Sequence, residues 1–356
     1  MSEQLVNKNR MVYPDILRIV AAVAVVMLHV SGIGMFTYED SGTDYLISEL
    51  FNICVRFSVP VFFMLSGMFF LDPQKSISIK TIFTKHIPRL LVPLVFWGVF
   101  YFYLERAING VPVGLQDLPG ALYSLLSVDG FLILWFLYTL IGLYIASPVL
   151  RAVIKSSTKK QLEYFLLIGF LFTSLLPYLA YIPQLAFLSR LEFFLNLTMV
   201  SGYVLLFVLG YYLKTYSFSK HVKMIVYTLG IAGLLATVFF TLAAHQNEEI
   251  PQNVFLEPYS PNIIFCSSAI FLLFKSLFSK RAFKEKTLAS VRFFASASFG
   301  VYLIHYAFIF VFIKLGLSAA SFSPVFSIPI ITCLCFFGSV FVSWVLKKIP
   351  LLNRLV

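Results

Sequence analysis

The chain has 356 residues, of which 60% are hydrophobic and only 12% are charged, and its mean hydropathy is +0.89. A soluble protein of this length needs far more polar surface, so the composition excludes a soluble globular domain and predicts a multi-pass membrane protein. The net charge of +11 does not indicate a nucleic-acid partner, because no basic run alternates with aromatic residues outside the apolar segments.

Ten apolar segments approach the ~20 residues that a helix needs to cross the hydrocarbon. We predict an all-α, polytopic membrane protein with about ten transmembrane helices, near residues 14–36, 50–71, 87–104, 131–149, 162–181, 199–213, 224–244, 260–278, 294–313 and 327–346. The sixth segment is short. We expect one transmembrane domain over residues 1–356, with short tails at 1–13 and 347–356, and the first segment retained because no small-residue cleavage pattern follows it.

The basic residues predict the orientation. With ten spans and the N-terminus inside, only Arg56, Arg106, Arg190 and Lys314 of the 27 Lys and Arg fall on the outer side. This asymmetry follows the positive-inside rule and predicts that both termini are cytoplasmic. The acidic stretches 37–49 and 245–261 are then expected to face outward.

The first segment, "YPDILRIVAAVAVVMLHVSG" (13–32), carries Asp15, Arg18 and His29. Ionisable groups at membrane depth cost roughly 2.5–3.5 kcal/mol and usually face a partner or a cavity. On a helix, Arg18 and His29 are about 16 Å apart on nearly one face, and Asp15 can pair with Arg18. We expect a narrow slot with a cation at its inner mouth and a proton acceptor at its far end. The alternative is a packing histidine and an arginine that reaches lipid phosphate.

The next segments carry further cations. Arg56 lies near the outer end of the second segment, where it can pair with Glu49 or an acid of another outer loop, or extend toward the surface. Lys85, His86 and Arg89 stand at the cytoplasmic entry to the third segment. They can hold a polyanion or simply follow the positive-inside rule.

His305 lies near the middle of the ninth segment, at a depth close to that expected for His29. Two histidines can form an acid–base pair, a proton relay or a metal pair. We expect no metal, because no carboxylate or cysteine ligand shares their depth. Considered alone, His305 fits a structural role equally well. The four cysteines lie in apolar stretches and are expected to be small apolar fillers.

Six motifs occur in an order that resembles a known family. "LRIVAAVAVVMLHV" (17–30) resembles the Arg-x10-His signature of the bacterial acyltransferase-3 family of integral membrane O-acyltransferases. The others are "VPVFFMLSGMFF" (59–70), "PRLLVPLVFW" (88–97), "LWFLYTLIGLYIASPVLR" (134–151), "GYVLLFVLGYYL" (202–213) and "FGVYLIH" (299–305). The resemblance covers nearly the whole chain and includes the ten spans.

The resemblance implies a membrane-bound O-acyltransferase, usually an O-acetyltransferase, of the bacterial cytoplasmic (inner) membrane. It implies transfer from cytoplasmic acyl-CoA, such as acetyl-CoA, to a hydroxyl of a cell-envelope carbohydrate. By position, His29 matches the catalytic histidine and Arg18 its partner, and Arg89, with Lys85, matches the basic cluster that meets CoA phosphates. We expect the CoA arm to follow the slot, His29 to act as general base, and His305 to orient it or share the proton.

Several details stay open. Ser66, or a backbone amide near Gly67 or Pro60, is a candidate oxyanion donor, and an acyl-histidine intermediate is a variant of direct transfer. Some members carry a C-terminal esterase-like domain, which is absent here, so we expect transfer to finish in the membrane domain or to involve a separate protein. The acceptor, an acetyl or succinyl donor, and the oligomeric state are not specified.

Two other functions also fit the sequence. A proton-coupled transporter or flippase of a glycolipid or small organic acid would use the histidines as a relay, although such proteins often show inverted repeats and none is evident here. A non-catalytic receptor would keep the fold without the chemistry, and the intact Arg18 and His29 argue against it.

Overall fold

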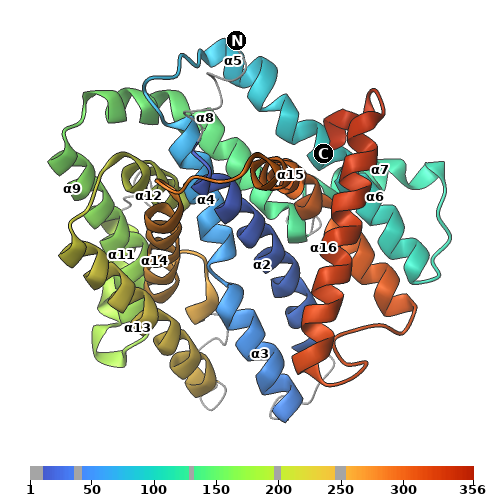
Figure 1. Ribbon diagram of the computed structural model, residues 1–356. Coiled ribbons are helices and arrows are strands. Elements are labelled where there is room, and N and C mark those ends of the chain that lie inside the picture. Colours follow the sequence, from blue (N-terminus) through green and yellow to red (C-terminus); the bar gives the residue numbers. More distant parts are fainter. Residues whose placement is uncertain (1–10, 36–41, 128–131, 196–201, 245–253) are drawn as a thin grey trace. The chain divides into compact units, whose positions relative to one another are not determined.

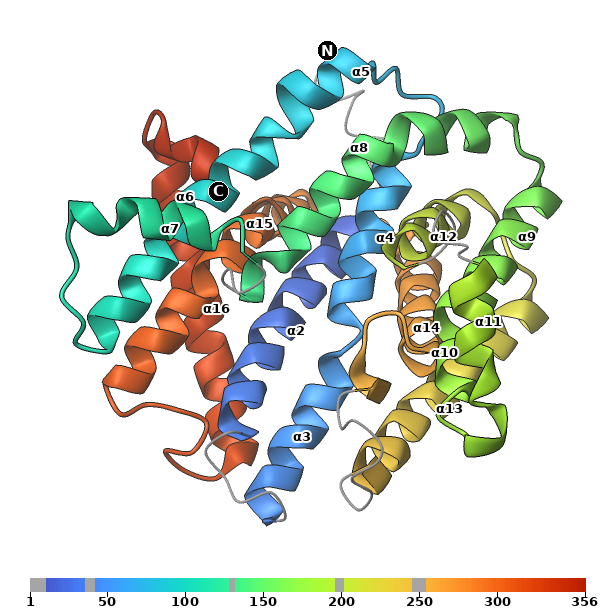
Figure 2. The same ribbon diagram turned by 180° about the vertical axis from the view of Figure 1, so that it is seen from behind.

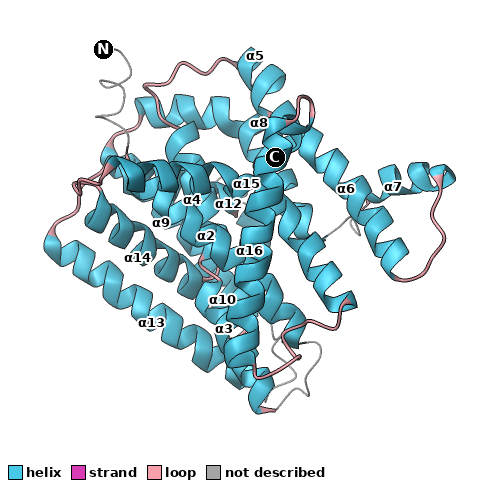
Figure 3. Cartoon of the chain, turned by 45° about the vertical axis from the view of Figure 1, so that its right-hand side comes forward, coloured by secondary structure: helices cyan, strands magenta, loops and turns pink. Residues whose placement is uncertain are grey.

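The computed structural model describes residues 11–35, 42–127, 132–195, 202–244 and 254–356, so most of the expected tail 1–13 lies outside the described residues. Within these ranges the regular elements are helices, and no strand occurs (Figure 3). The all-α prediction is confirmed. The main helices are α2 (Tyr13–Met35), α3 (Thr43–Val55), α4 (Ser58–Phe70), α6 (Pro88–Ile108), α7 (Leu118–Ser124), α8 (Trp135–Ser156), α9 (Lys159–Phe170), α11 (Phe187–Leu195), α12 (Tyr203–Thr215), α13 (Lys220–Ala244), α14 (Pro261–Phe278), α15 (Glu285–Lys314) and α16 (Pro324–Lys348).

In the described part of the chain, nine helical segments are long and apolar enough to cross a membrane. They correspond to nine of the ten predicted spans and confirm a polytopic membrane protein. The sixth predicted span corresponds to α12, whose 13 residues give about 20 Å of helix, less than the thickness of the hydrocarbon. The first residues predicted for this span, 199–201, lie outside the described ranges. The cytoplasmic side of the two termini stays a prediction.

The helices extend beyond the apolar segments that predicted them. The second span was expected at 50–71, but its helical segment begins at Thr43 and is divided into α3 and α4 by a turn at Arg56 and Phe57. The predicted start was wrong because the first two turns contain polar residues. One of these, Ser48, is buried and donates a hydrogen bond to the carbonyl of Asp44 (2.9 Å), so the helix satisfies this hydroxyl itself.

The described chain forms two compact units. The first comprises the described residues of the ranges Met1–Ala24, Ile53–Asp72 and Ser157–Ser296, and the second comprises the described residues of Val25–Asn52, Pro73–Ser156 and Ala297–Val356. Helices α2 and α15 each contribute residues to both units.

In the first unit, α4 and α12 pack against each other at a close crossing (Figure 1). A Cβ atom added at Gly67 would overlap the backbone carbonyl of Phe207, and one added at Gly210 would overlap the backbone carbonyl of Met64. Small residues at such points let two backbones approach, which is how helices pack tightly inside a membrane. The two glycines are therefore required by the crossing.

Helices α13 and α14 form the second close pair of this unit and lie side by side in both views (Figures 1 and 2). A Cβ at Gly233 would meet the backbone carbonyl of Asn262. The buried Asn262 amide donates to the hydroxyl of Thr237 (2.7 Å), which itself donates to the carbonyl of Gly233 (2.8 Å). The polar side chains thus satisfy one another where the helices touch.

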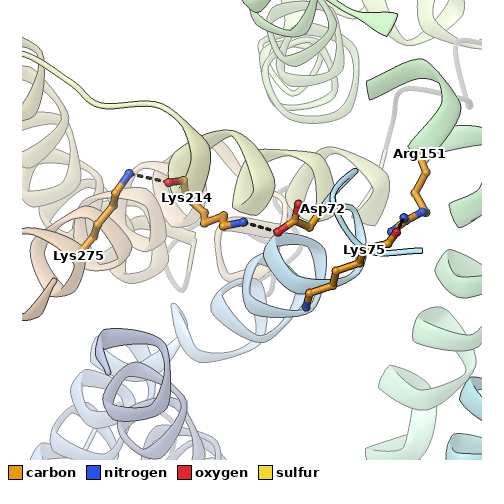
Figure 4. A network of polar contacts seen from close by, with 5 residues as sticks. All are labelled: Asp72, Lys75, Arg151, Lys214 and Lys275. Atoms are coloured by element: carbon orange, nitrogen blue, oxygen red, sulfur yellow. Dashed lines mark hydrogen bonds and ion pairs between the residues drawn. The ribbon is translucent and has the colours of Figure 1, made fainter. Parts of the chain in front are cut away.

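A polar network closes the C-terminal ends of α4 and α12 (Figure 4). The Lys275 ammonium donates to the carbonyls of Leu213 (2.6 Å), Lys214 (2.9 Å) and Tyr216 (2.8 Å). The Lys214 ammonium forms an ion pair with Asp72, directly after α4 (2.7 Å). Carbonyls that the helix end leaves unsatisfied are therefore capped by a cation.

In the second unit, α6 is tied to the end of the chain and to α15. The indole nitrogen of Trp97 donates to the carbonyl of Leu355 (2.9 Å), and the Tyr101 hydroxyl donates to the carbonyl of Leu303 (2.6 Å). At the end of α8, the Arg151 guanidinium donates to the carbonyl of Lys75 (Figure 4). These bonds hold the elements that carry the candidate site of this unit.

Candidate functional site

Helix α2 carries Arg18 and His29 on one continuous stretch, eleven residues apart, as the sequence predicted. Arg18 forms the expected ion pair with Asp15 (3.5 Å), and its guanidinium carbon lies 5.6 Å from the centroid of the Phe69 ring. The Arg18 side chain is 30% exposed.

The small side chains between Arg18 and His29 are packed. Ala21, Ala22 and Val25 are at most 4% exposed. The slot that the sequence suggested along this face stays a prediction.

His29 and His305 lie side by side in the second unit. Their ring centroids are 5.2 Å apart, with an angle of 36° between the ring planes. His305 is completely buried, whereas His29 is partly exposed. The sequence predicted only that the two histidines have similar depth, and the structure brings their rings side by side.

The surroundings of His305 fix which of its nitrogens carries a proton. Nδ1 lies 2.9 Å from the carbonyl of Val301, and a carbonyl oxygen only accepts, so Nδ1 must donate. In a neutral ring, Nε2 then carries the lone pair. Nε2 is buried and makes no hydrogen bond to any described residue. The ring therefore holds an unused proton acceptor.

Two tyrosines lie beside the histidines, and a third packs against one of these tyrosines. The Tyr306 ring stands edge-on to both, with centroids 5.5 Å from His29 and 6.2 Å from His305. Tyr302 lies 6.4 Å from His305 and Tyr101 lies 6.4 Å from Tyr306. The Tyr302 hydroxyl donates to the carbonyl of Ile133 (2.5 Å), and that of Tyr101 donates to Leu303, so both are held by the backbone. Tyr302 and Tyr306 thus line the histidine pair with aromatic surface, and the hydrogen bonds of Tyr101 and Tyr302 hold α15 in place.

Asn52 holds the turn of α2 that carries His29. Its buried side-chain amide donates to the carbonyl of Leu28 (2.9 Å) and to the hydroxyl of Ser31 (3.2 Å). Ser31 donates in turn to the carbonyl of Met27 (2.7 Å). A buried amide with two partners on an adjacent helix is a strong positional constraint.

Sequence reasoning missed Asn52 and the tyrosines. Asn52 is a polar residue within the run "LFNICV", and Tyr302 and Tyr306 flank His305 within one turn, so both signals were present. Tyr101 gave no such signal, because Leu303, whose carbonyl its hydroxyl bonds, is 202 residues away in the sequence.

The cationic candidate Lys85 lies within an irregular turn, and Arg89 lies in the helix that follows it. Residues Ile82–His86 form a π-helical turn, and α6 begins at Pro88. Lys85 and Arg89 are exposed, and neither has an acidic partner among the described residues. The His86 ring lies 6.3 Å from that of Tyr144 on α8. Such π-helical turns frequently occur at functional sites.

A cation that the sequence analysis did not single out joins this group. Lys347, in the last turn of α16, lies within electrostatic range of Arg89. Arg89 therefore has a like charge on each side of it, Lys347 from α16 and Lys85 from the turn before α6, and an anion would stabilise such neighbouring cations.

Two of the candidate oxyanion donors are engaged elsewhere: the Ser66 hydroxyl donates to the carbonyl of Phe62 (2.8 Å), and Gly67 lies inside helix α4. Pro60 lies in the first turn of α4, and an oxyanion donor near it stays a prediction. The amide at Gly67 is therefore engaged in the helix, and the absence of its side chain is explained by the crossing with α12. In the described part of the chain, no group of three or more His, Cys, Asp or Glu is arranged to hold a metal ion.

Comparison with known proteins gives one match. A family model described as an acyltransferase domain, of the acyltransferase-3 type, matches residues 11–348. No curated protein and no solved structure matches the chain. The match includes Arg18, His29, Lys85, Arg89 and His305.

Proposed function

The chain belongs to the acyltransferase-3 family of membrane acyltransferases, and from this premise we propose that it is an O-acetyltransferase of the bacterial cytoplasmic membrane. The donor is acetyl-CoA, or another acyl-CoA, on the cytoplasmic side. The acceptor is a hydroxyl of a cell-envelope glycan or glycolipid. The observation that supports this proposal is the pair of His29 and His305, with a free acceptor nitrogen on the buried ring.

His29 acts as the general base. It takes the proton of the acceptor hydroxyl as the hydroxyl oxygen attacks the thioester carbonyl carbon. The new carbon–oxygen bond forms, the carbon–sulfur bond breaks, and the proton on His29 passes to the leaving CoA thiolate. The imidazole is thereby regenerated in its neutral form.

His305 orients His29 and shares its proton. The hydrogen bond from Nδ1 to Val301 leaves Nε2 facing its surroundings as an acceptor. A ring separation of 5.2 Å allows an N–H of His29 to approach that nitrogen, and catalytic hydrogen bonds often tighten only when substrate is bound. A base oriented by a third group is the logic of the catalytic triads.

The cations hold the donor. CoA carries a diphosphate and a further phosphate, and Lys85 and Arg89 are exposed and lack acidic partners among the described residues. Lysine and arginine bind phosphate through charge-assisted hydrogen bonds. Arg18 contributes the guanidinium that the family signature pairs with His29, eleven residues before it on α2.

The test compares three variants in a strain that lacks the gene. His29→Ala and Arg18→Ala should accumulate in the membrane as the wild type does but add no acetyl group to envelope glycans, measured by mass spectrometry as the loss of one acetyl mass. His221→Ala, an exposed histidine at the start of α13, serves as the matched control and should acetylate normally.

Retained acetylation by His29→Ala removes the proposal. A wild-type protein that moves a glycolipid or an organic acid together with protons, without consuming acetyl-CoA, identifies it as a transporter.

A further inference from the structure

An irregular stretch of backbone precedes α14 in the first unit. Residues 254–260 form one 3-10 turn followed by bends, within a segment apolar enough to cross a membrane. At membrane depth, non-helical backbone is tolerated only where protein buries it or where it lines a cavity. We call this stretch the 254–260 segment.

Side chains donate hydrogen bonds to five of the backbone carbonyls of the 254–260 segment. The donors come from several parts of the unit: Tyr178 to Val254 (2.8 Å), Asn262 to Phe255 (2.8 Å), Arg56 to Leu256 (3.4 Å), Ser260 to Glu257 (2.8 Å) and Ser174 to Tyr259 (2.6 Å). Five donors for seven residues fix the segment in a single conformation. The segment is therefore a structured part of the fold, held by side-chain hydrogen bonds, although it is not helical.

The 254–260 segment carries one carboxylate, that of Glu257. It is partly exposed and makes no hydrogen bond or close ion pair with any described residue. It lies within electrostatic range of Arg56 and of the phenols of Tyr178 and Tyr203. A half-buried carboxylate with unused acceptor capacity is costly unless a ligand fills it.

Aromatic rings stand beside this carboxylate. The Tyr203 ring packs on Phe63 of α4, with centroids 4.5 Å apart, and meets the edge of Tyr259 at 5.8 Å with an angle of 79°. Tyr203 and Tyr259 are partly exposed. Their rings offer apolar faces and polar tips at the same place.

Together these groups match one ligand chemistry. A carboxylate accepts hydrogen bonds from two neighbouring hydroxyls, and a guanidinium donates to hydroxyl and ring oxygens. An aromatic face packs against the C–H face of a saturated ring. A sugar ring offers all three features, whereas a simple anion would be repelled by Glu257.

We infer that Glu257, Arg56 and the Tyr203–Tyr259 pair form the acceptor site, and that this site binds a sugar ring of the envelope glycan. The inference rests on the proposed function, since it assigns the acceptor of that reaction. The charge asymmetry of the loops predicts that the 254–260 segment faces outward, on the side from which the acceptor enters. Arg56, which the sequence analysis expected to pair with Glu49 or with an acid of another outer loop, lies within electrostatic range of Glu257 without forming a close ion pair.

The test separates acceptor use from donor binding. Glu257→Gln and Tyr259→Ala, purified in lipid nanodiscs, should bind acetyl-CoA within about two-fold of wild type. In cells lacking the gene, the same variants should lower alkali-released acetate from envelope glycans by about ten-fold or more, because a charged hydrogen bond contributes about 1.5–3 kcal/mol. Tyr259→Phe keeps the ring and should retain most of the acetylation. Glu285→Gln, the same change at an exposed carboxylate on α15, should leave both measurements unchanged.

Each other outcome overturns the inference. Wild-type acetylation by both Glu257→Gln and Tyr259→Ala excludes an acceptor site here. Parallel loss of acetyl-CoA binding and of acetylation shows that the segment supports the fold or the donor. If the wild type itself binds no acetyl-CoA and adds no acetate, the proposed function fails first, and the acceptor site falls with it.

Discussion

Replacing His305 with Asn tests the two ring nitrogens separately. The Asn amide can take the place of Nδ1 and keep the hydrogen bond to Val301, which contributes about 0.5–1.5 kcal/mol to stability. Nothing replaces Nε2, the buried acceptor. If that nitrogen shares the proton of His29, the rate should fall by about 10²–10⁴-fold, the usual contribution of a positioned acid or base.

The assay is the initial rate of CoA thiol release by the purified variant in nanodiscs, with acetyl-CoA and the envelope glycan fraction as acceptor. His305→Gln is the matched variant, since it places a polar atom near Nε2 and loses the bond to Val301. It should lose more stability and less activity than His305→Asn. A wild-type rate for His305→Asn refutes proton sharing. Equal losses of rate and of unfolding temperature in both variants show that His305 only supports the fold.

Gly67→Ala drives a methyl group into a backbone carbonyl of α12 and should destabilise the protein by about 1–3 kcal/mol in thermal unfolding, whereas Gly142→Ala, with open space beside it, should not; equal unfolding of the two contradicts the close crossing. Asn52→Leu removes both hydrogen bonds to α2 and should cost about 1–3 kcal/mol of unfolding free energy, so an unchanged unfolding temperature excludes its positioning role. Substituting both Lys85 and Arg89 with Ala should raise the KM for acetyl-CoA by about ten-fold at low salt, and by less as salt screens the charges; a KM that does not change rules them out of the donor site.

The sequence predicted most of the helices and their class because span length and hydropathy are local properties. It also predicted the pair of Asp15 and Arg18, which are three residues apart on one helix. Boundaries were less accurate. The start of the second span was displaced because the buried hydroxyl of Ser48 is satisfied within its own helix, which the pattern of polar residues does not show.

The candidate site was only partly predictable for a related reason. Matching depth suggested that His29 and His305 belong together, but the contact depends on how α2 and α15 pack. The hydrogen bond of Tyr101 joins residues far apart in the chain, and no local pattern encodes it. The interpretation of Gly67 was wrong because a glycine needed for close helix packing and one needed for an exposed amide look the same in a sequence.

The three hydrogen bonds of Lys275 show that part of the basic residues of this chain serve the fold itself. Its ammonium donates all three of its N–H groups to carbonyls at the end of α12, and Lys214 forms an ion pair with Asp72. Arg151 is likewise engaged with the backbone at Lys75. The formal excess of eleven positive charges already counts Asp72, so these contacts leave the net charge of the chain unchanged. They occupy hydrogen-bond donors instead, and the charge-assisted hydrogen bonds that a nucleotide phosphate can receive depend on the cations whose N–H groups the fold has not engaged.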